Sequence, residues 1–376
     1  MRNDNISFSP SVNIVRDNDK DLNYVVTKNA IKVANQTIGL GHPCFIIAEA
    51  GVNHNGNLQM ALQLVDAAAN AGANAIKFQT FKTEYLVTPN AVKASYQLQT
   101  TDANESQFEM LKKLELSPED HKTILAHCKT KDILFMSTPF EESSADFLQS
   151  LDISVFKTPS GEITNLPFLH HVAKKQIPII VSTGMSHLGE VESAVDTIAK
   201  TGNNQLALLH CVSNYPTDPQ DVNLKAMHTL HTAFGYPVGY SDHTQGSEIT
   251  LAAVALGASV IEKHFTLDRT MPGPDHQASL EPQELSDLIC GIRNIERAIG
   301  SGQKAPAASE ENSASVIRKS LVAAQNISKG EKLTEDVIAI RRPGTGLPPT
   351  VRPFLLGRTT KVNIPEGTVL SLDMLL

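Results

Sequence analysis

The sequence predicts an α/β protein whose main domain is a (β/α)8 TIM barrel. Between residues 43 and 299, eight short apolar runs rich in β-branched residues alternate with helical stretches, which matches the size of such a barrel. Runs that are apolar throughout indicate parallel strands buried on both faces. Because no glycine-rich dinucleotide loop interrupts the repeats, we favour a closed barrel over a doubly wound open sheet.

The predicted elements follow one another regularly along this region. Strands are expected at 45–50, 75–80, 133–138, 154–160, 177–183, 206–211, 237–242 and 259–265. Helices are expected at 57–72, 117–129, 141–150, 166–175, 188–200, 221–234, 245–256 and 281–299. In the first helix, Leu58, Leu62, Val65 and Ala69 are expected on one face, and Gly72 ends the helix.

The composition and the hydrophobic pattern of the sequence change on both sides of the predicted barrel. Residues 1–42 are predicted to form a polar N-terminal extension with a possible capping hairpin at 31–38. Residues 300–314 are small, polar and proline-containing, which is typical of a linker. Residues 315–376 contain short strand-like pieces broken by Gly and Pro, and predict a small β-rich domain without a long helix.

Composition excludes several classes of partner. A net charge of −8, the absence of Trp and 5% aromatic residues argue against nucleic-acid binding. No apolar run approaches the roughly 20 residues that span a bilayer, and the N-terminus lacks the features of a signal peptide. The four cysteines have no paired spacing, so we expect reduced thiols in a cytoplasmic protein.

Polar side chains cluster where the predicted strands end, and TIM-barrel active sites lie at that end of the strands. A buried strand loses hydration energy for each such group, so folding alone does not explain the pattern. The predicted site includes Glu49, Lys77, Gln79, Thr138, Lys157, Ser160, Glu162, Ser182, Ser213, Tyr215, Ser241, His243 and His264.

Two lysines, Lys77 and Lys157, lie within otherwise apolar strands and require anionic partners. Hydroxyl groups at neighbouring strand ends are suited to phosphate and carboxylate oxygens. These residues predict a small, doubly anionic ligand such as a phosphoenol carboxylate. An internal salt bridge is the alternative for either lysine alone.

Two histidines, His243 and His264, end the last two strands. Neutral imidazole is a common ligand for transition metals, so the pair could share one ion with Glu49 or Asp275 nearby. Each histidine taken alone could equally be a general base or a structural group. The histidines at 121, 127, 228 and 231 fall on predicted helices and are expected at the surface.

Together these motifs resemble the sialic acid synthase family, whose members make nonulosonic acids from phosphoenolpyruvate and an N-acylated hexosamine. In the barrel the motifs are IIAEAGVNHNG (46–56), IKFQT (76–80), STPF (137–140), KTPSGEITN (157–165), STGM (182–185), YSDHT (240–244) and EKHFTLDRTMPGPDHQASLEP (262–282). In the tail, RRPGTGLPP (341–349) and LLGRTTKVNIPEG (355–367) resemble the family's C-terminal antifreeze-like (SAF) domain. The resemblance covers about residues 30–376.

The resemblance implies a role for each matching residue. Lys77, Thr138, Lys157, Ser160, Ser182 and Ser241 match residues that hold phosphoenolpyruvate. His243 and His264 match ligands of a divalent metal ion, Mn²⁺ or Mg²⁺. Glu49, Gln79, Glu162, Tyr215 and Asp275 match residues around the sugar and the reacting carbons. Arg342 matches an arginine that the partner subunit places over the N-acyl group, which implies a domain-swapped homodimer.

The resemblance leaves the sugar and the proton carrier open. Ser213 and Ile317 stand where some members of the family have Asn and an aromatic residue. We expect N-acetylneuraminate synthase, with N,N'-diacetyllegionaminate synthase, which uses 2,4-diacetamido-2,4,6-trideoxymannose, as the alternative and pseudaminate synthase as a weaker one. Glu49 or Asp275 is the expected proton carrier for the water that adds to the reacting carbon. The rival interpretations are a Schiff-base aldolase using Lys157 or Lys77, and a binding protein.

Overall fold

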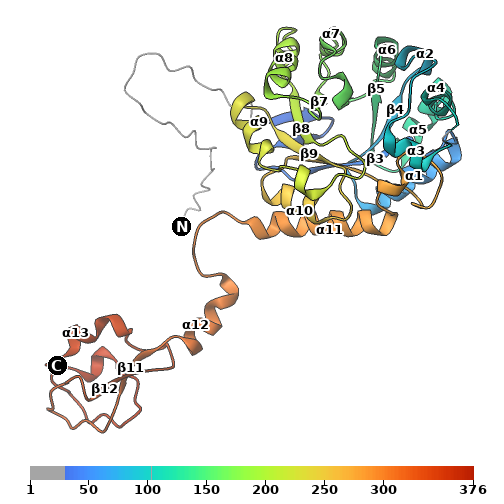
Figure 1. The fold of residues 1–376 in the computed structure, drawn as a ribbon. Coiled ribbons are helices and arrows are strands. Elements are labelled where there is room, and N and C mark those ends of the chain that lie inside the picture. Colours follow the sequence, from blue (N-terminus) through green and yellow to red (C-terminus); the bar gives the residue numbers. More distant parts are fainter. Residues whose placement is uncertain (1–29, 103) are drawn as a thin grey trace, which may run out of the picture. The chain divides into compact units, whose positions relative to one another are not determined.

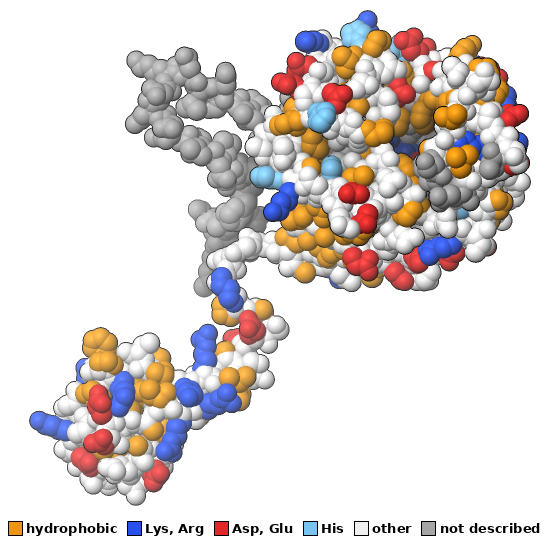
Figure 2. All heavy atoms as spheres, in the orientation of Figure 1, with side chains coloured by type: hydrophobic (Ala, Val, Ile, Leu, Met, Phe, Trp, Pro, Cys, Tyr) orange, Lys and Arg blue, Asp and Glu red, His pale blue; other side chains and the backbone are white. Residues whose placement is uncertain are grey.

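The computed structural model describes residues 30–102 and 104–376 (Figure 1). The chain divides into two compact units, one ending at Ile299 and the other comprising Gly300–Leu376. In the described part of the chain, no helix has both the length and the apolarity that crossing a membrane requires. On the face of the barrel unit seen in Figure 2, acidic and basic side chains are interspersed, and neither sign forms a continuous field.

Eight strands form one sheet in the first unit, and their bounds lie close to the predicted ones. They are β3 (Phe45–Gly51), β4 (Ala75–Thr80), β5 (Leu134–Pro139), β6 (Phe156–Thr158), β7 (Ile179–Ser182), β8 (Leu206–Cys211), β9 (Val238–Asp242) and β10 (Val260–His264). Their order in the sheet is β5-β4-β3-β10-β9-β8-β7-β6. The hydrogen-bonded neighbours run parallel, and contacts between β5 and β6 close the ring. The predicted barrel is confirmed.

An outer layer of helices surrounds the strands (Figure 1). It contains α1 (Leu58–Ala71), α5 (Pro118–Thr130), α6 (Glu142–Ser150), α7 (Leu166–Ala173), α8 (Leu188–Ala199), α9 (Ala226–Phe234), α10 (Glu248–Ala255) and α11 (Pro282–Ile299). Gly72 ends α1 in the left-handed region with φ 87°, as predicted. The buried face of α1 is Ala61, Leu64, Val65 and Ala68. The predicted apolar face was only partly right, because Val65 is buried but Leu58, Leu62 and Ala69 are only partly buried at the margin of the core.

A hairpin covers the N-terminal end of the barrel. It consists of β1 (Ala30–Val33) and β2 (Gln36–Gly39), which pair antiparallel. Ile31, Val33 and Ile38 join one buried apolar cluster with the first residues of several barrel strands, including Phe45 and Val260. Because this end is plugged, ligands reach the barrel from the opposite, C-terminal end of the strands. Residues 1–29 of the predicted extension lie outside the described residues.

Three short helices between β4 and α5 have no counterpart in the sequence prediction. They are α2 (Thr83–Leu86), α3 (Ser95–Thr100) and α4 (Gln107–Lys112). Met110 of α4 packs with Val52, Phe81 and Leu114 in a small apolar cluster of its own. This cluster fastens the segment 81–114, hereafter the β4–α5 insert, to the C-terminal end of the barrel.

The second unit is small and rich in turns. It contains α12 (Glu311–Ile317), the antiparallel pair β11 (Ser320–Ala323) and β12 (Ile338–Arg341), and α13 (Arg352–Leu355). Its core includes Leu321, Ile338, Ile364 and Leu370. The predicted linker differs in one respect, because α12 begins within 300–314. Just before that helix, the Ala307 N–H donates a hydrogen bond to the Glu310 carboxylate.

Candidate active site

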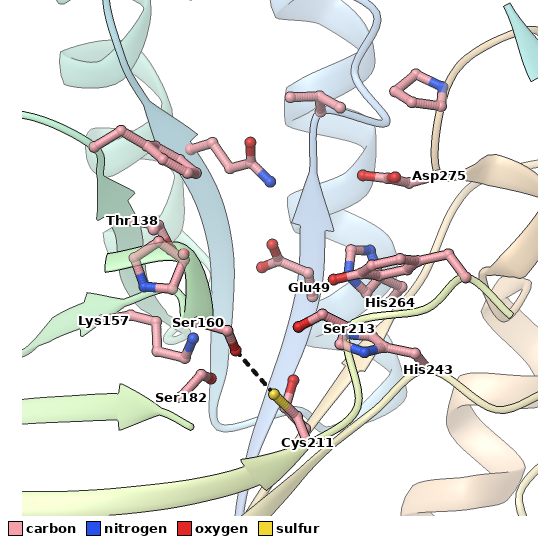
Figure 3. A pocket seen from close by; sticks show the side chains of 18 of the residues that line it. Glu49, Thr138, Lys157, Ser160, Ser182, Cys211, Ser213, His243, His264 and Asp275 are labelled. Atoms are coloured by element: carbon pink, nitrogen blue, oxygen red, sulfur yellow. Dashed lines mark hydrogen bonds between the residues drawn. The ribbon is translucent and has the colours of Figure 1, made fainter. Parts of the chain in front are cut away.

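A cavity of about 450 Å³ opens at the C-terminal ends of the barrel strands. It brings together nearly all of the predicted site residues (Figure 3). These are Glu49, Lys77, Gln79, Thr138, Lys157, Ser160, Ser182, Ser213, Tyr215, Ser241, His243, His264 and Asp275. Two predicted residues are not in the lining. Glu162 is half-buried and accepts a hydrogen bond from Asn165 (2.7 Å), and Arg342 is an exposed residue of the second unit.

The floor of the cavity is a cluster of buried charges. Lys77 Nζ lies 2.8 Å from Glu49 Oε2 and 3.7 Å from Glu262 Oε2, and it donates to Thr138 Oγ1 (3.0 Å). Lys157 Nζ lies 3.6 Å from Glu262 Oε1. Each lysine therefore has the anionic partner that a buried ammonium requires. Both lysines therefore form the internal salt bridges that the sequence left as the alternative, and their ammonium groups lie together at one pocket floor.

Burial and charge shift the pKa values of this cluster in opposite directions. Burial raises the pKa of Glu49 to about 7, although Lys77 opposes the shift. Burial alone would also raise the pKa of Glu262, but Lys157 and Lys77 reverse the effect and bring it to about 2. Burial lowers the pKa of Lys157. The neighbouring carboxylates outweigh burial at Lys77 and hold its pKa above the ordinary value.

Hydroxyl and thiol groups converge beside Gly184. Ser160 Oγ accepts a hydrogen bond from the Gly184 N–H (3.0 Å) and lies 3.0 Å from Cys211 Sγ (Figure 3). A Cβ atom on Gly184 would lie 2.5 Å from Ser213 Oγ and 2.8 Å from Ser160 Oγ. Ser182 Oγ is buried without a hydrogen-bond partner among the described residues. The Ser160 and Ser182 hydroxyls line the cavity and can donate hydrogen bonds to a small anion there.

A second convergence surrounds Gly51, whose φ is +51°. Within 4 Å of the position that a Cβ would take lie Glu49 Oε1, Gln79 Nε2 and Asp275 Oδ2. Burial raises the pKa of Asp275 to about 6. Two carboxyl groups that exchange protons near neutral pH therefore lie close together at one side of the cavity, which suits them to general acid–base work.

His243 and His264 lie beside each other at the ends of the neighbouring strands β9 and β10, with ring centroids 5.4 Å apart. Burial lowers the pKa of both imidazoles, so both are neutral at pH 7. The Nδ1–H of His243 donates to the Val212 carbonyl (2.7 Å), which leaves Nε2 with a free lone pair. His264 Nδ1 is buried without a hydrogen-bond partner in the described ranges.

These features fit two ligands of a divalent metal ion. A metal-binding histidine usually donates its other ring N–H to a carbonyl or carboxylate, as His243 does here. The buried Nδ1 of His264, which has no partner among the described residues, is available to a ligand. In residues 30–102 and 104–376, no cluster of three or more His, Cys, Asp or Glu side chains suited to a metal forms. Neither Glu49 nor Asp275, one of which was expected to be the third ligand, therefore joins the two histidines in such a cluster.

Three features of the site had no assigned role in the sequence prediction, which placed Glu262 among the polar residues at the end of the eighth strand without giving it a function. Glu262 bridges both lysines and accepts from Ser241 Oγ (3.0 Å), and Cys211 lies against Ser160. The β4–α5 insert adds an apolar part of the lining with Leu86, Val87, Met110 and Leu111. The alternation of β10 already placed Glu262 on the same face as His264, and this was the signal that could have identified it.

One histidine contradicts the expectation of surface positions. His121 of α5 is 1% exposed, with Nε2 2.8 Å from Thr80 Oγ1 and Nδ1 2.9 Å from the Ser117 carbonyl. It faces inward because the polar ends of β4 and β5 need partners there. His228 is exposed, and His127 and His231 are half-buried.

Comparison with known proteins agrees with the motifs. The chain is 50% identical to the N,N'-diacetyllegionaminic acid synthase of Campylobacter jejuni over 86% of its own length and 98% of that protein. It is 36% identical to human N-acetylneuraminate-9-phosphate synthase over 88% of the chain and 92% of that protein. A crystal structure of N-acetylneuraminic acid synthetase from Leptospira borgpetersenii matches with a TM-score of 0.67 and 37% identity, covering 76% of this chain and 95% of that one.

Two family models match in sequence. The SAF domain matches residues 318–376, which confirms the antifreeze-like module, and the NeuB family matches residues 64–304. The chain, with its barrel, its charged pocket and its SAF domain, therefore belongs to the NeuB family of sialic and legionaminic acid synthases.

Proposed function

We propose that this enzyme is an N,N'-diacetyllegionaminate synthase. It would condense phosphoenolpyruvate with 2,4-diacetamido-2,4,6-trideoxymannose and water, and release inorganic phosphate. The observation that carries the proposal is the meeting of two buried lysines and two neutral histidines in one pocket of a chain 50% identical to a legionaminic acid synthase.

The comparisons favour the legionaminate alternative over the expected N-acetylneuraminate synthase. Identity to the human N-acetylneuraminate-9-phosphate synthase is 36%, well below the 50% to the legionaminic acid synthase. The pocket supports the same choice, since the β4–α5 insert places Leu86, Met110 and Leu111 along one side. The trideoxy sugar carries an acetamido methyl at C4 and a methyl at C6 for such a surface, whereas N-acetylmannosamine carries hydroxyls at both positions.

Phosphoenolpyruvate would lie over the charged floor of the cavity. Lys77 and Lys157 would meet its phosphate and carboxylate, and the hydroxyls of Thr138, Ser160 and Ser182 would complete the hydrogen bonds. Holding both anionic ends fixes the plane of the enol, so that its nucleophilic carbon points at the sugar aldehyde.

His243 and His264 would hold the divalent ion, Mn²⁺ or Mg²⁺. When bound, such an ion acts as a Lewis acid that polarises the aldehyde oxygen. The neutral state of both rings keeps their lone pairs available for this task, and the anchored Nδ1 of His243 fixes its tautomer.

Protons would be carried by the carboxyl groups beside Gly51. Attack of the enol carbon on the aldehyde leaves a cationic carbon next to the phosphate oxygen, and water adds there before phosphate leaves by C–O cleavage. Asp275, whose pKa burial raises to about 6, would accept the proton of that water. Glu49 is held by Lys77 at 2.8 Å, so we assign it to orienting that lysine and to a secondary proton role.

Arg342 and the quaternary structure complete the proposal. We infer that the enzyme is a domain-swapped homodimer in which Arg342 of each SAF domain approaches the sugar bound by the other subunit. The planar guanidinium would donate to an acyl carbonyl. The four free cysteines, three of them buried, fit an enzyme of the reducing cytoplasm.

Product analysis tests the proposal. Purified enzyme with Mn²⁺, phosphoenolpyruvate and the diacetamido sugar should give one nonulosonic acid, identified by mass spectrometry, with one phosphate released per product. Absence of that product, or the same yield without phosphoenolpyruvate, would contradict it.

The Schiff-base alternative needs its own test, because burial lowers the pKa of Lys157 as a nucleophilic amine requires. Borohydride added during turnover should leave the mass of the protein unchanged. A covalent adduct at Lys157 would favour the aldolase instead.

A further inference from the structure

A buried ion pair lies directly behind the two histidines. Asp242 is the last residue of β9, Lys263 is the penultimate residue of β10, and the two are register partners across these strands. Each immediately precedes a histidine of the site in the sequence. Their side chains are 0% and 1% exposed, and neither lines the cavity. The pair therefore cannot touch a ligand in the cavity.

The pair organises the backbone at the ends of both strands. Lys263 Nζ lies 2.9 Å from Asp242 Oδ2 and donates to the Thr244 carbonyl (2.5 Å). Asp242 Oδ1 accepts from both the N–H and the hydroxyl of Thr244 (2.8 Å each). Thr250, on α10, donates its hydroxyl to Asp242 Oδ2 (2.5 Å). One cluster thus ties together β9, β10, the turn after β9 and α10.

His243 is held on both sides by this cluster. Asp242 precedes it and Thr244 follows it, and both are fixed by the contacts above. The ring Nδ1–H donates to the Val212 carbonyl (2.7 Å), and the His243 carbonyl accepts from the Thr217 N–H (2.8 Å). His264 follows Lys263 directly, and no hydrogen bond holds its Nδ1 within the described residues. The carbonyl of His264 accepts from the Leu280 N–H (2.9 Å) and its ring packs against Tyr215, while Lys263 ties the same strand end to Asp242 and Thr244.

Energetics argue that such a pair serves geometry rather than stability. Removing two charges from water costs about as much as their attraction returns, so replacing a buried pair by neutral side chains is often neutral or stabilising. Removing one partner alone is strongly destabilising, because it leaves a buried charge without its counter-ion. This pair links the ends of β9 and β10, each of which is followed by or ends in a histidine of the site. It can therefore fix the distance between His243 and His264.

We propose that Asp242 and Lys263 are positioning residues that set the separation and orientation of His243 and His264 for a shared divalent cation. This inference rests on the metal role in the proposed function. Residues that orient metal ligands from behind change metal affinity by about 10–100-fold when they are replaced.

The test compares stability with metal binding in the full-length protein. Lys263→Met and Asp242→Asn each leave one charge unpaired and should lower Tm. The double variant removes both charges, while the Asn oxygen still accepts from the Thr244 N–H, so its Tm should recover. Mn²⁺ binding, measured by the loss of the free-ion EPR signal, should nevertheless be at least about 10-fold weaker in the double variant.

A matched control is available at the other end of the barrel. Arg293 and Glu296 of α11 form an ion pair (2.9 Å) that contacts Cys44, just before β3. The Arg293→Met/Glu296→Gln double variant should change Tm without changing the Kd for Mn²⁺.

The outcomes separate this proposal from the proposed function. A double variant that binds Mn²⁺ with wild-type Kd, while His264→Ala does not bind it, would overturn the positioning role and leave the metal role intact. Wild-type protein that binds no Mn²⁺ would overturn both. Should the double variant fail to fold, Thr250→Val removes one hydrogen bond to Asp242 without unpairing a charge. It should weaken Mn²⁺ binding several-fold, and an unchanged Kd would overturn the proposal.

Discussion

Gly184 lies against three side chains of the pocket lining, which leave no room for a Cβ atom. A methyl group there would lie 2.5–2.9 Å from Ser213 Oγ, Ser160 Oγ and Cys211 Sγ, so at least one of these side chains must move. We predict that Gly184→Ala lowers kcat/KM for phosphoenolpyruvate by roughly 100-fold, the scale of a misplacement of about 1 Å. Gly161→Ala is the control, because Gly161 lines the cavity and a Cβ there would meet nothing within 4 Å. Equal kinetics in the two variants would contradict this geometry.

Asp275 gives the enzyme a pH dependence of stability with a definite sign. Burial raises its pKa from 3.8 to about 6, so between these values the unfolded chain has released a proton that the folded protein keeps. The free energy of unfolding therefore falls as pH rises through this window. Asp275→Asn cannot ionise, and its stability relative to wild type should rise by about 3 kcal/mol between pH below 4 and pH above 6. Urea unfolding at several pH values checks this, and a constant difference would contradict it.

Single residues show what a linear pattern can and cannot reveal. Lys77 and Lys157 stood out because a charge in an apolar strand demands an explanation. Glu262 bridges the same two lysines, yet it was recognised only as one polar residue at the end of the eighth strand, because nothing in the EKH triplet shows which cations it will meet. His121 was misplaced for a physical reason, since helix position alone does not say that the ends of β4 and β5 need its ring as a partner.

At the scale of elements, the β4–α5 insert is expected to contribute to the affinity for the sugar substrate. Met110 is 3% exposed and packs on Val52, Phe81 and Leu114 while also lining the cavity. Met110→Ala should cost about 2–5 kcal/mol of local packing and loosen the insert against the barrel. We predict a larger rise in KM for the sugar than for phosphoenolpyruvate, whose partners lie on the strands. Steady-state kinetics with each substrate varied will check this, and equal rises would contradict it.

The strands were predictable because burial on both faces leaves a continuous apolar signature. The insert was not, since α2, α3 and α4 are four to six residues long and too short for a helical period to emerge. Its Ser106 capping box was a local signal that could have indicated α4. The hairpin at 31–38 and its capping role were anticipated, and the barrel residues on which it packs needed the structure.

At the scale of the whole molecule, the proposed dimer makes a complementation prediction. A chain with Arg342→Ala keeps its own barrel chemistry, and a chain with Lys157→Ala keeps its own arginine. If Arg342 acts on the partner's site, an equal mixture of the refolded chains should form heterodimers with one working site, giving about a quarter of wild-type activity. Phosphate release from the mixture measures this. No gain over the separate variants would contradict an arginine supplied by the partner.

The net charge of −8 describes the whole chain and does not reveal the two lysines buried in the pocket beside Glu49 and Glu262. Lys77 and Lys157 are 2–3% exposed, so they contribute little to the surface and much to the pocket. The family could be read from the strand-end motifs, because those motifs belong to the barrel that the family model matches. The identity of the sugar could not, because some of its proposed contacts come from the β4–α5 insert, which contains none of those motifs.

The central claim is that the pocket selects a 2,4-diacetamido-2,4,6-trideoxymannose over N-acetylmannosamine. Both sugars offered together to the enzyme, with limiting phosphoenolpyruvate and Mn²⁺, compete for one active site, and the ratio of the two products gives the ratio of kcat/KM values. We predict that the diacetamido sugar is preferred by at least about 100-fold, the range that one or two apolar contacts provide. A preference for N-acetylmannosamine would contradict the assignment.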